Sequence, residues 1–168
     1  MKKLFIFSVM ALFATTLMAQ EKKAAASPAA TATGKIGAAT VTINYAQPAV
    51  KGREIFGALV PFGEVWRTGA NGATSFEVDK DVKIEGKVLK AGKYGFFTIP
   101  AKDGEWTIIF NSDSKQWGSY DYSAKKDALR VKVKSSKTDA VTERMTFDVK
   151  ASEVVLSWEK TKVAFKIN

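Results

Sequence analysis

Apolar side chains that recur at every second position constrain the fold of this chain more than any other feature. The segment 39–45 (ATVTINY) alternates apolar and polar residues, which is typical of a strand with one buried and one solvated face. The same period returns at 76–78, 82–84, 129–133, 145–149, 154–158 and 163–167. Turn signals separate about 8 or 9 such short strands, and no helical period is sustained. We therefore predict an all-β fold, an antiparallel β-sandwich, with a flattened β-barrel as the alternative.

The stretch 52–71 (GREIFGALVPFGEVWRTGAN) interrupts this alternation. Its three glycines before position 64 and its proline break any regular element longer than a turn or two. We expect a long, irregular, partly helical loop here, with one short helix over 53–59.

Two segments, 93–100 and 105–111, carry apolar side chains on both faces. A strand with two apolar faces needs two covers. One cover is the second sheet. We hypothesise that the irregular loop supplies part of the other through Ile55, Phe56, Leu59 and Trp66, which would then lie near Phe97 and Ile109.

The first nineteen residues have the three parts of a secretory signal: Lys2 and Lys3, an apolar run over 4–17, and Ala19 before the cut. We predict a signal peptide over 1–19, a flexible Ala/Thr/Lys linker over 20–34 and one β-sandwich domain over 35–168.

No second run of about 20 apolar residues follows, so no transmembrane segment is expected in the mature chain. The chain has no cysteine to carry a lipid anchor. We expect an exported, soluble protein, periplasmic or secreted, that is not a lipoprotein.

The formal net charge is +9, and removal of Lys2 and Lys3 with the signal leaves 24 basic residues against 17 acidic ones, or +7. This balance favours anionic partners. Nucleic acid is not expected, because the chain is exported and its aromatic residues are not interleaved with the basic ones.

The chain also has no histidine. Without histidine and cysteine, Ser-His-Asp and Cys-His triads and the zinc sites built on these ligands are excluded. Carboxylate pairs remain, and the acids in turn or loop settings are Glu54, Glu64, Asp121 and Asp127. None has a catalytic signature, so we predict no catalytic residue, no metal site and no cofactor.

The hexapeptide 66–71 (WRTGAN) holds the strongest candidates for ligand contact. The guanidinium of Arg67 is a planar fork of donors suited to a carboxylate or phosphate, and Trp66 beside it could stack on a ligand or exclude water. The alternative is an internal tie, in which Arg67 is held by a buried acid or by loop carbonyls. Asn71 has the same two interpretations: it satisfies loop backbone groups or presents its amide to a ligand.

A second loop, 116–123, carries three large aromatic residues, Trp117, Tyr120 and Tyr122. They could form a platform on which sugar rings stack, with the hydroxyl groups at its rim. Alternatively they fold inward as a lid on the core, since large aromatic groups are costly to expose.

The chain resembles an exported bacterial family catalogued as domain of unknown function twenty-nine eleven. The resemblance covers nearly all of 41–168 and is carried by Gly52-Arg53, Ile55-Phe56-Gly57, Leu59-Val60-Pro61, 65–71 (VWRTGAN), Ala91-Gly92 with Tyr94, 97–100 (FTIP), Trp117-Gly118 with Tyr120, and Trp158-Glu159. One departure is Gly72, where members of the family often have Glu. The resemblance implies an exported, β-rich protein and brings no established activity with it.

Three functional hypotheses follow. The first is a non-catalytic module that binds a small anionic or carbohydrate ligand in the cell envelope, with Arg67, Asn71, Trp66, Trp117 and Tyr120 as candidate contacts. The second is a hydrolase of envelope polysaccharide that uses paired carboxylates. The third is a purely structural envelope protein in which 66–71 serves folding alone.

Overall fold

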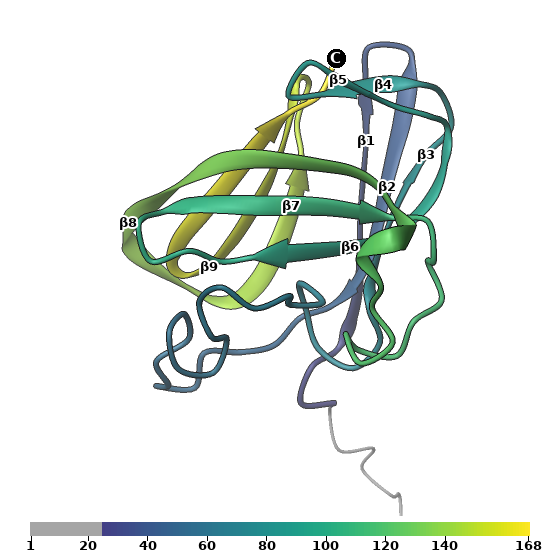
Figure 1. Ribbon diagram of the computed structural model, residues 1–168. Coiled ribbons are helices and arrows are strands. Elements are labelled where there is room, and N and C mark those ends of the chain that lie inside the picture. Colours follow the sequence, from purple (N-terminus) through teal and green to yellow (C-terminus); the bar gives the residue numbers. More distant parts are fainter. Residues whose placement is uncertain (1–24) are drawn as a thin grey trace, which may run out of the picture.

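The computed structural model describes residues 25–168, which form an all-β domain (Figure 1). Its nine strands are β1 (Ala29–Ile36), β2 (Ala39–Ala46), β3 (Thr74–Val78), β4 (Val82–Ile84), β5 (Lys87–Leu89), β6 (Gly92–Ile99), β7 (Glu105–Asn111), β8 (Asp127–Val149) and β9 (Glu153–Lys166). One 3-10 turn, η1 (Ala124–Lys126), precedes β8. The alternating sequence pattern thus predicted the fold class correctly, whereas the predicted strands 129–133 and 145–149 belong to β8, and 154–158 and 163–167 belong mostly to β9.

Seven strands form one antiparallel sheet in the order β1-β2-β3-β6-β7-β8-β9, while β4 and β5 pair as a separate hairpin. The long strand β8 pairs with β7 through its first half and with β9 through its second half. Figure 1 shows β6 and β7 running across the direction of β1 and β2. The sheet therefore curls until it is nearly closed into a barrel, an architecture compatible with both predicted forms.

Contacts outside the sheet order nearly close the barrel. The Val50 N–H donates to the carbonyl of Glu143 (2.8 Å), and the Met145 N–H donates to the carbonyl of Pro48 (3.0 Å). Strand β1 approaches β8 so closely at Gly34 that an added Cβ would lie 2.8 Å from Val149 Cγ1. A residue without a side chain is therefore required at this contact.

The core lies inside the curl and is rich in aromatic side chains. Phe76, Phe96, Phe110 and Phe165 come from β3, β6, β7 and β9, and their ring centroids lie 4.9 to 6.2 Å apart. Buried aromatic pairs in such stacked and edge-on arrangements add to the stabilisation that burial of apolar area provides.

The irregular loop 52–71 differs from the prediction in two ways. Residues 55–59 form turns in place of the short helix expected over 53–59, and a hydrogen bond from the Val60 N–H to the Ile55 carbonyl (2.8 Å) closes them. The loop also packs into the inner core, where Phe56 meets Trp106 at 4.9 Å. The outer face at Phe97 is covered instead by Tyr122, at 5.1 Å between centroids. The hypothesis that Phe56 and Trp66 cover Phe97 and Ile109 is therefore wrong.

The linker predicted over 20–34 contains part of a strand, because residues 29–34 belong to β1 and pair with β2. Ala30 and Ala32 pack against the core and alternate with Thr31 and Thr33. Because these side chains are small, the apolar alternation of this strand is weak in the sequence. The predicted signal peptide over 1–19 and the linker residues before 25 lie outside the described residues. No helix in the part of the chain that the structure describes is long and apolar enough to cross a membrane.

Candidate functional site

The hexapeptide 66–71 is fastened to two strands at the end of the barrel opposite the C-terminus (Figure 1). Trp66 pairs with Thr98 of β6 through two backbone hydrogen bonds, of 2.8 and 2.9 Å. On the other side, the hydroxyl of Thr74 in β3 donates to the Thr68 carbonyl (2.7 Å). The Trp66 indole N–H donates to the Gly69 carbonyl at 3.2 Å. These bonds fix the backbone on both sides of Arg67.

Two residues of the hexapeptide have left-handed backbone conformations. Thr68 has φ of 52° and Asn71 has φ of 62°. Asn adopts this region readily, whereas for a β-branched residue it is a true outlier that costs roughly 1–3 kcal/mol. The Thr68 hydroxyl is fully buried and donates to the Trp66 carbonyl or to Thr98 Oγ1, at 3.2 and 3.1 Å. Strained residues of this kind cluster at binding and catalytic sites.

Arg67 lies in a cleft of about 230 Å³, which we call the arginine cleft. Its lining is Ser27, Pro48, Arg53, Leu59, Val60, Trp66, Arg67, Gly69, Ala70 and Trp158. The Arg67 side chain is half-buried, and its Nε is fully buried with no acceptor in hydrogen-bond distance among residues 25–168. Within the same residues, none of the ion pairs involves Arg67. The predicted internal tie to a buried acid is therefore not what holds this side chain.

Two tryptophans line the arginine cleft and pack against each other. Trp66 and Trp158 of β9 are stacked, with ring centroids 5.7 Å apart and planes 18° apart. Phe56 meets both rings edge-on, each at 5.9 Å. The Trp158 indole Nε1 is also buried without an acceptor in the described range. A site lined by apolar rings excludes water and so strengthens the attraction between a guanidinium and an anion.

Arg53 is the second cation of the cleft, and its guanidinium is held by the backbone. Its Nε donates to the Val50 carbonyl (3.0 Å) and an Nη to the Ala49 carbonyl (2.6 Å). Sequence reasoning missed Arg53 and Trp158 as site residues. Arg53 belongs to the irregular loop, and Trp158 comes from a strand about ninety positions further along the chain.

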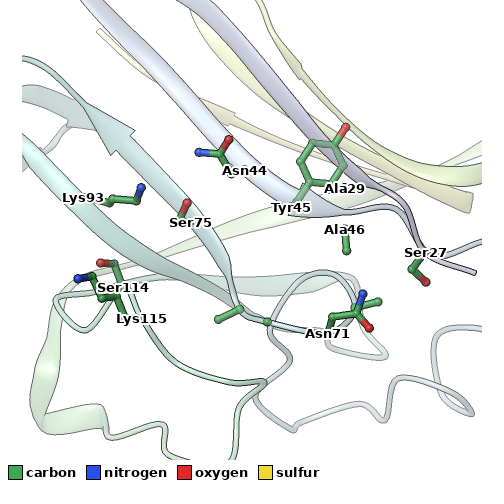
Figure 2. A pocket seen from close by; sticks show the side chains of 13 residues that line it. Ser27, Ala29, Asn44, Tyr45, Ala46, Asn71, Ser75, Lys93, Ser114 and Lys115 are labelled. Atoms are coloured by element: carbon green, nitrogen blue, oxygen red, sulfur yellow. The ribbon is translucent and has the colours of Figure 1, made fainter. Parts of the chain in front are cut away.

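Asn71 lies in a different hollow, of about 430 Å³, on the outer face of the sheet (Figure 2). We call it the outer hollow. It shares Ser27 and Ala70 with the arginine cleft, and its remaining lining is Ala29, Asn44, Tyr45, Ala46, Asn71, Gly72, Ala73, Ser75, Lys93, Ser114 and Lys115. The hexapeptide therefore separates two neighbouring concave surfaces, with Arg67 in one and Asn71 in the other.

The structure does not place Trp117 and Tyr120 with the other candidates. Their side chains are 67% and 86% exposed, and neither lines the arginine cleft or the outer hollow. Of the three aromatic residues in this loop, Tyr122 alone turns inward, onto Phe97. Trp66, by contrast, is 8% exposed and forms part of the floor of the arginine cleft.

Three of the four candidate acids are exposed, and the fourth is held by neighbouring side chains. Glu54, Glu64 and Asp121 are exposed. Asp127 accepts from Tyr122 Oη (2.7 Å) and pairs with Arg130. Burial, and then the hydrogen bond to Asp127, raise the pKa of the Tyr122 phenol.

The model of one protein family, described as protein of unknown function (DUF2911), matches residues 27–167. No curated protein and no solved structure matches the chain. The match covers nearly the whole described domain, and the chain belongs to this family.

Proposed function

We propose that this member of the DUF2911 family is an exported, non-catalytic binding module, and that its arginine cleft holds a small anion, a carboxylate or a phosphate. One observation carries the proposal. The Arg67 residue is half-buried in a concave site without a counter-ion among the described residues, and its buried Nε lacks an acceptor. A charge withdrawn from water is stable only when it is paired, so a bound anion would supply the missing partner.

The chemistry of the lining fits an anion. Arg53 adds a second positive charge, and its guanidinium is positioned by the backbone carbonyls of Ala49 and Val50. Trp66 and Trp158 form a flat apolar floor on which a planar group can lie. Arginine is the residue that recognises planar carboxylates and phosphates through two parallel hydrogen bonds.

The size of the cleft restricts the ligand. Pockets for drug-sized molecules enclose roughly 300–1,000 Å³, whereas this cleft encloses about 230 Å³. It therefore suits a group of a few heavy atoms, such as one carboxylate-bearing or phosphate-bearing end of a molecule.

Thermal melting with and without anions tests the proposal. The exported chain is melted in sodium acetate, inorganic phosphate and sodium chloride at equal ionic strength. A ligand at about 100 times its dissociation constant adds ~2.7 kcal/mol to the free energy of unfolding. We expect acetate or phosphate to raise the melting temperature above the value in chloride, with saturation as the anion concentration rises.

Two variants make the test specific. Arg67→Met removes the charge from the cleft and is expected to abolish the saturable shift. Lys125→Met removes one charge from an exposed side chain of η1 and should retain the shift. A shift that persists in Arg67→Met, or one that chloride reproduces, would show that the cleft does not bind the anion.

A further inference from the structure

The outer hollow lies on a row of short side chains that crosses the sheet. The backbone register places Thr31, Asn44, Ser75, Gly95 and Asn111 opposite one another on five successive strands, β1, β2, β3, β6 and β7. The loop after β7 covers one end of this row, because a Cβ on Gly95 would lie 2.6 Å from the Asp113 carbonyl oxygen. Asn44 and Ser75 remain at the hollow, which Lys115 of that loop also lines (Figure 2).

Several polar groups at the hollow have no side-chain partner. No side-chain hydrogen bond is formed by the Asn71 amide, the Ser75 hydroxyl or the Lys115 ammonium group within residues 25–168. Lys93 has only a long ion pair, 3.5 Å from Glu77. Close to Lys115, the Gln116 Oε1 is buried without a donor in the same range. The Asn71 amide, the Ser75 hydroxyl and the two lysine ammonium groups can donate to hydroxyl groups and carboxylates, whereas Gln116 Oε1 can only accept.

Asn71 joins the hollow to the arginine cleft. It directly follows Ala70, which lines both, and it is exposed. The arginine cleft and the outer hollow thus form one extended site. Arg53 and Arg67 are the cations of the first half, and Lys93 and Lys115 are those of the second.

We propose that the outer hollow is the second half of a bipartite site for an acidic oligosaccharide. This inference rests on the proposed function, since one carboxylate of the saccharide occupies the arginine cleft. A neighbouring sugar residue lies in the outer hollow, where Asn71 and Ser75 bind hydroxyl groups and Lys93 and Lys115 bind a second carboxylate. A hollow of about 430 Å³ has room for a sugar ring.

A length series of oligogalacturonates, which carry one carboxylate per sugar, tests the proposal. Dissociation constants are measured by isothermal titration calorimetry for galacturonate and for its dimer, trimer and tetramer at constant ionic strength. When a ligand reaches a second subsite, the second contact is intramolecular and affinity rises steeply. We expect one step of at least tenfold, at the dimer or the trimer. Fully methyl-esterified oligomers of the same length lack the charges and should show no step.

Substitutions assign the step to the outer hollow. Lys115→Ala and Asn71→Gly should each reduce the step at least fivefold and leave the affinity for galacturonate monomer unchanged. Glycine suits position 71 because its backbone φ is 62°. The exposed Lys125→Ala serves as the control and should retain the full step.

The outcomes separate the two proposals. A step that is absent in the wild-type protein, or that survives in both Lys115→Ala and Asn71→Gly, overturns the bipartite site. If galacturonate monomer and acetate bind in an Arg67-dependent manner in that case, the anion site itself stands. If neither small anion responds to Arg67→Met, the proposed function fails, and the bipartite site fails with it.

Discussion

Replacing Arg67 by methionine should make the unliganded protein more stable. In most proteins the loss of a half-buried arginine breaks hydrogen bonds and destabilises the fold. Here the guanidinium has no ion pair, and its buried Nε has no acceptor in the described part of the chain. Methionine keeps an unbranched stem to pack against the tryptophans and removes the unpartnered donor.

The size of the effect follows from the cost of an unmade hydrogen bond. A buried donor without a partner costs ~1–3 kcal/mol. Some of this gain is offset, because methionine replaces a solvated part of the side chain that lies along the cleft. We expect a net gain of ~1–2 kcal/mol in the free energy of unfolding. For a domain of this size, that corresponds to a rise of roughly 3–8 °C in melting temperature.

The matched control is the same substitution at Arg53, in the same cleft. Its guanidinium donates to the carbonyls of Val50 and Ala49, at 3.0 and 2.6 Å. Arg53→Met should therefore lower the free energy of unfolding by ~1–2 kcal/mol, since hydrogen bonds to a charged donor are lost. Urea denaturation followed by tryptophan fluorescence, in a buffer without carboxylate or phosphate, measures both variants.

The opposite signs of the two effects are the test. If Arg67→Met lowers the free energy of unfolding by as much as Arg53→Met, the Arg67 guanidinium is a structural tie. The purely structural interpretation of the hexapeptide would then be correct. A phosphate-containing buffer should reverse the order of wild type and Arg67→Met if the anion binds tightly, because binding stabilises only the protein with the site.

Three further predictions concern the surroundings of the site. Gly95→Ala should lower the free energy of unfolding by ~1–3 kcal/mol in urea denaturation, because its Cβ would lie 2.6 Å from the Asp113 carbonyl oxygen. Gly72→Ala, which meets no atom within 4 Å, should change it by less than ~0.5 kcal/mol. The folded-state pKa of Tyr122 is raised above the unfolded value of 10.0. The neutral phenol therefore stabilises the folded protein fully below pH 10, and this stabilisation is lost as the pH rises through the folded pKa. Tyr122→Phe should accordingly lose stability less steeply above pH 10 in thermal melts, and an equal slope would contradict this. Trp117→Ala should leave both the free energy of unfolding and anion binding unchanged. Weaker binding of acetate by this variant would show that Trp117 contributes to the site.

Local patterns predicted the strands well because burial of one face imposes a period of two. Strand β2, for example, buries Val41, Ile43 and Tyr45, as the alternation indicates. Strand β1 escaped notice because its inward residues, Ala30 and Ala32, are too small to give an apolar signal. The contact that requires small residues there, between Gly34 and Val149, joins positions far apart in the sequence.

The site was predictable only in part, for a related reason. The unusual composition of 66–71 made Arg67 a candidate for ligand contact from the sequence, and this role stays a prediction. Its neighbours in the cleft come from distant segments, however, and no local pattern connects Trp158 with Trp66. Equally, the two apolar faces of β6 correctly indicated a second cover, whereas the choice of Tyr122 over the irregular loop depends on how the sheet curls.

Among residues 25–168, the buried side-chain polar atoms that lack a partner lie near the two concave surfaces. In the described part of the chain, the buried side-chain polar atoms without a partner are Arg67 Nε, Trp158 Nε1 and Gln116 Oε1. The first two belong to residues of the arginine cleft, and the third adjoins Lys115 of the outer hollow. The left-handed Thr68 follows Arg67 directly. A segment that served folding alone would satisfy these groups, since each unmade hydrogen bond destabilises the protein. Local conflicts of this kind are instead expected where a ligand completes the structure. The costs at this end of the barrel therefore favour a binding site over a structural device.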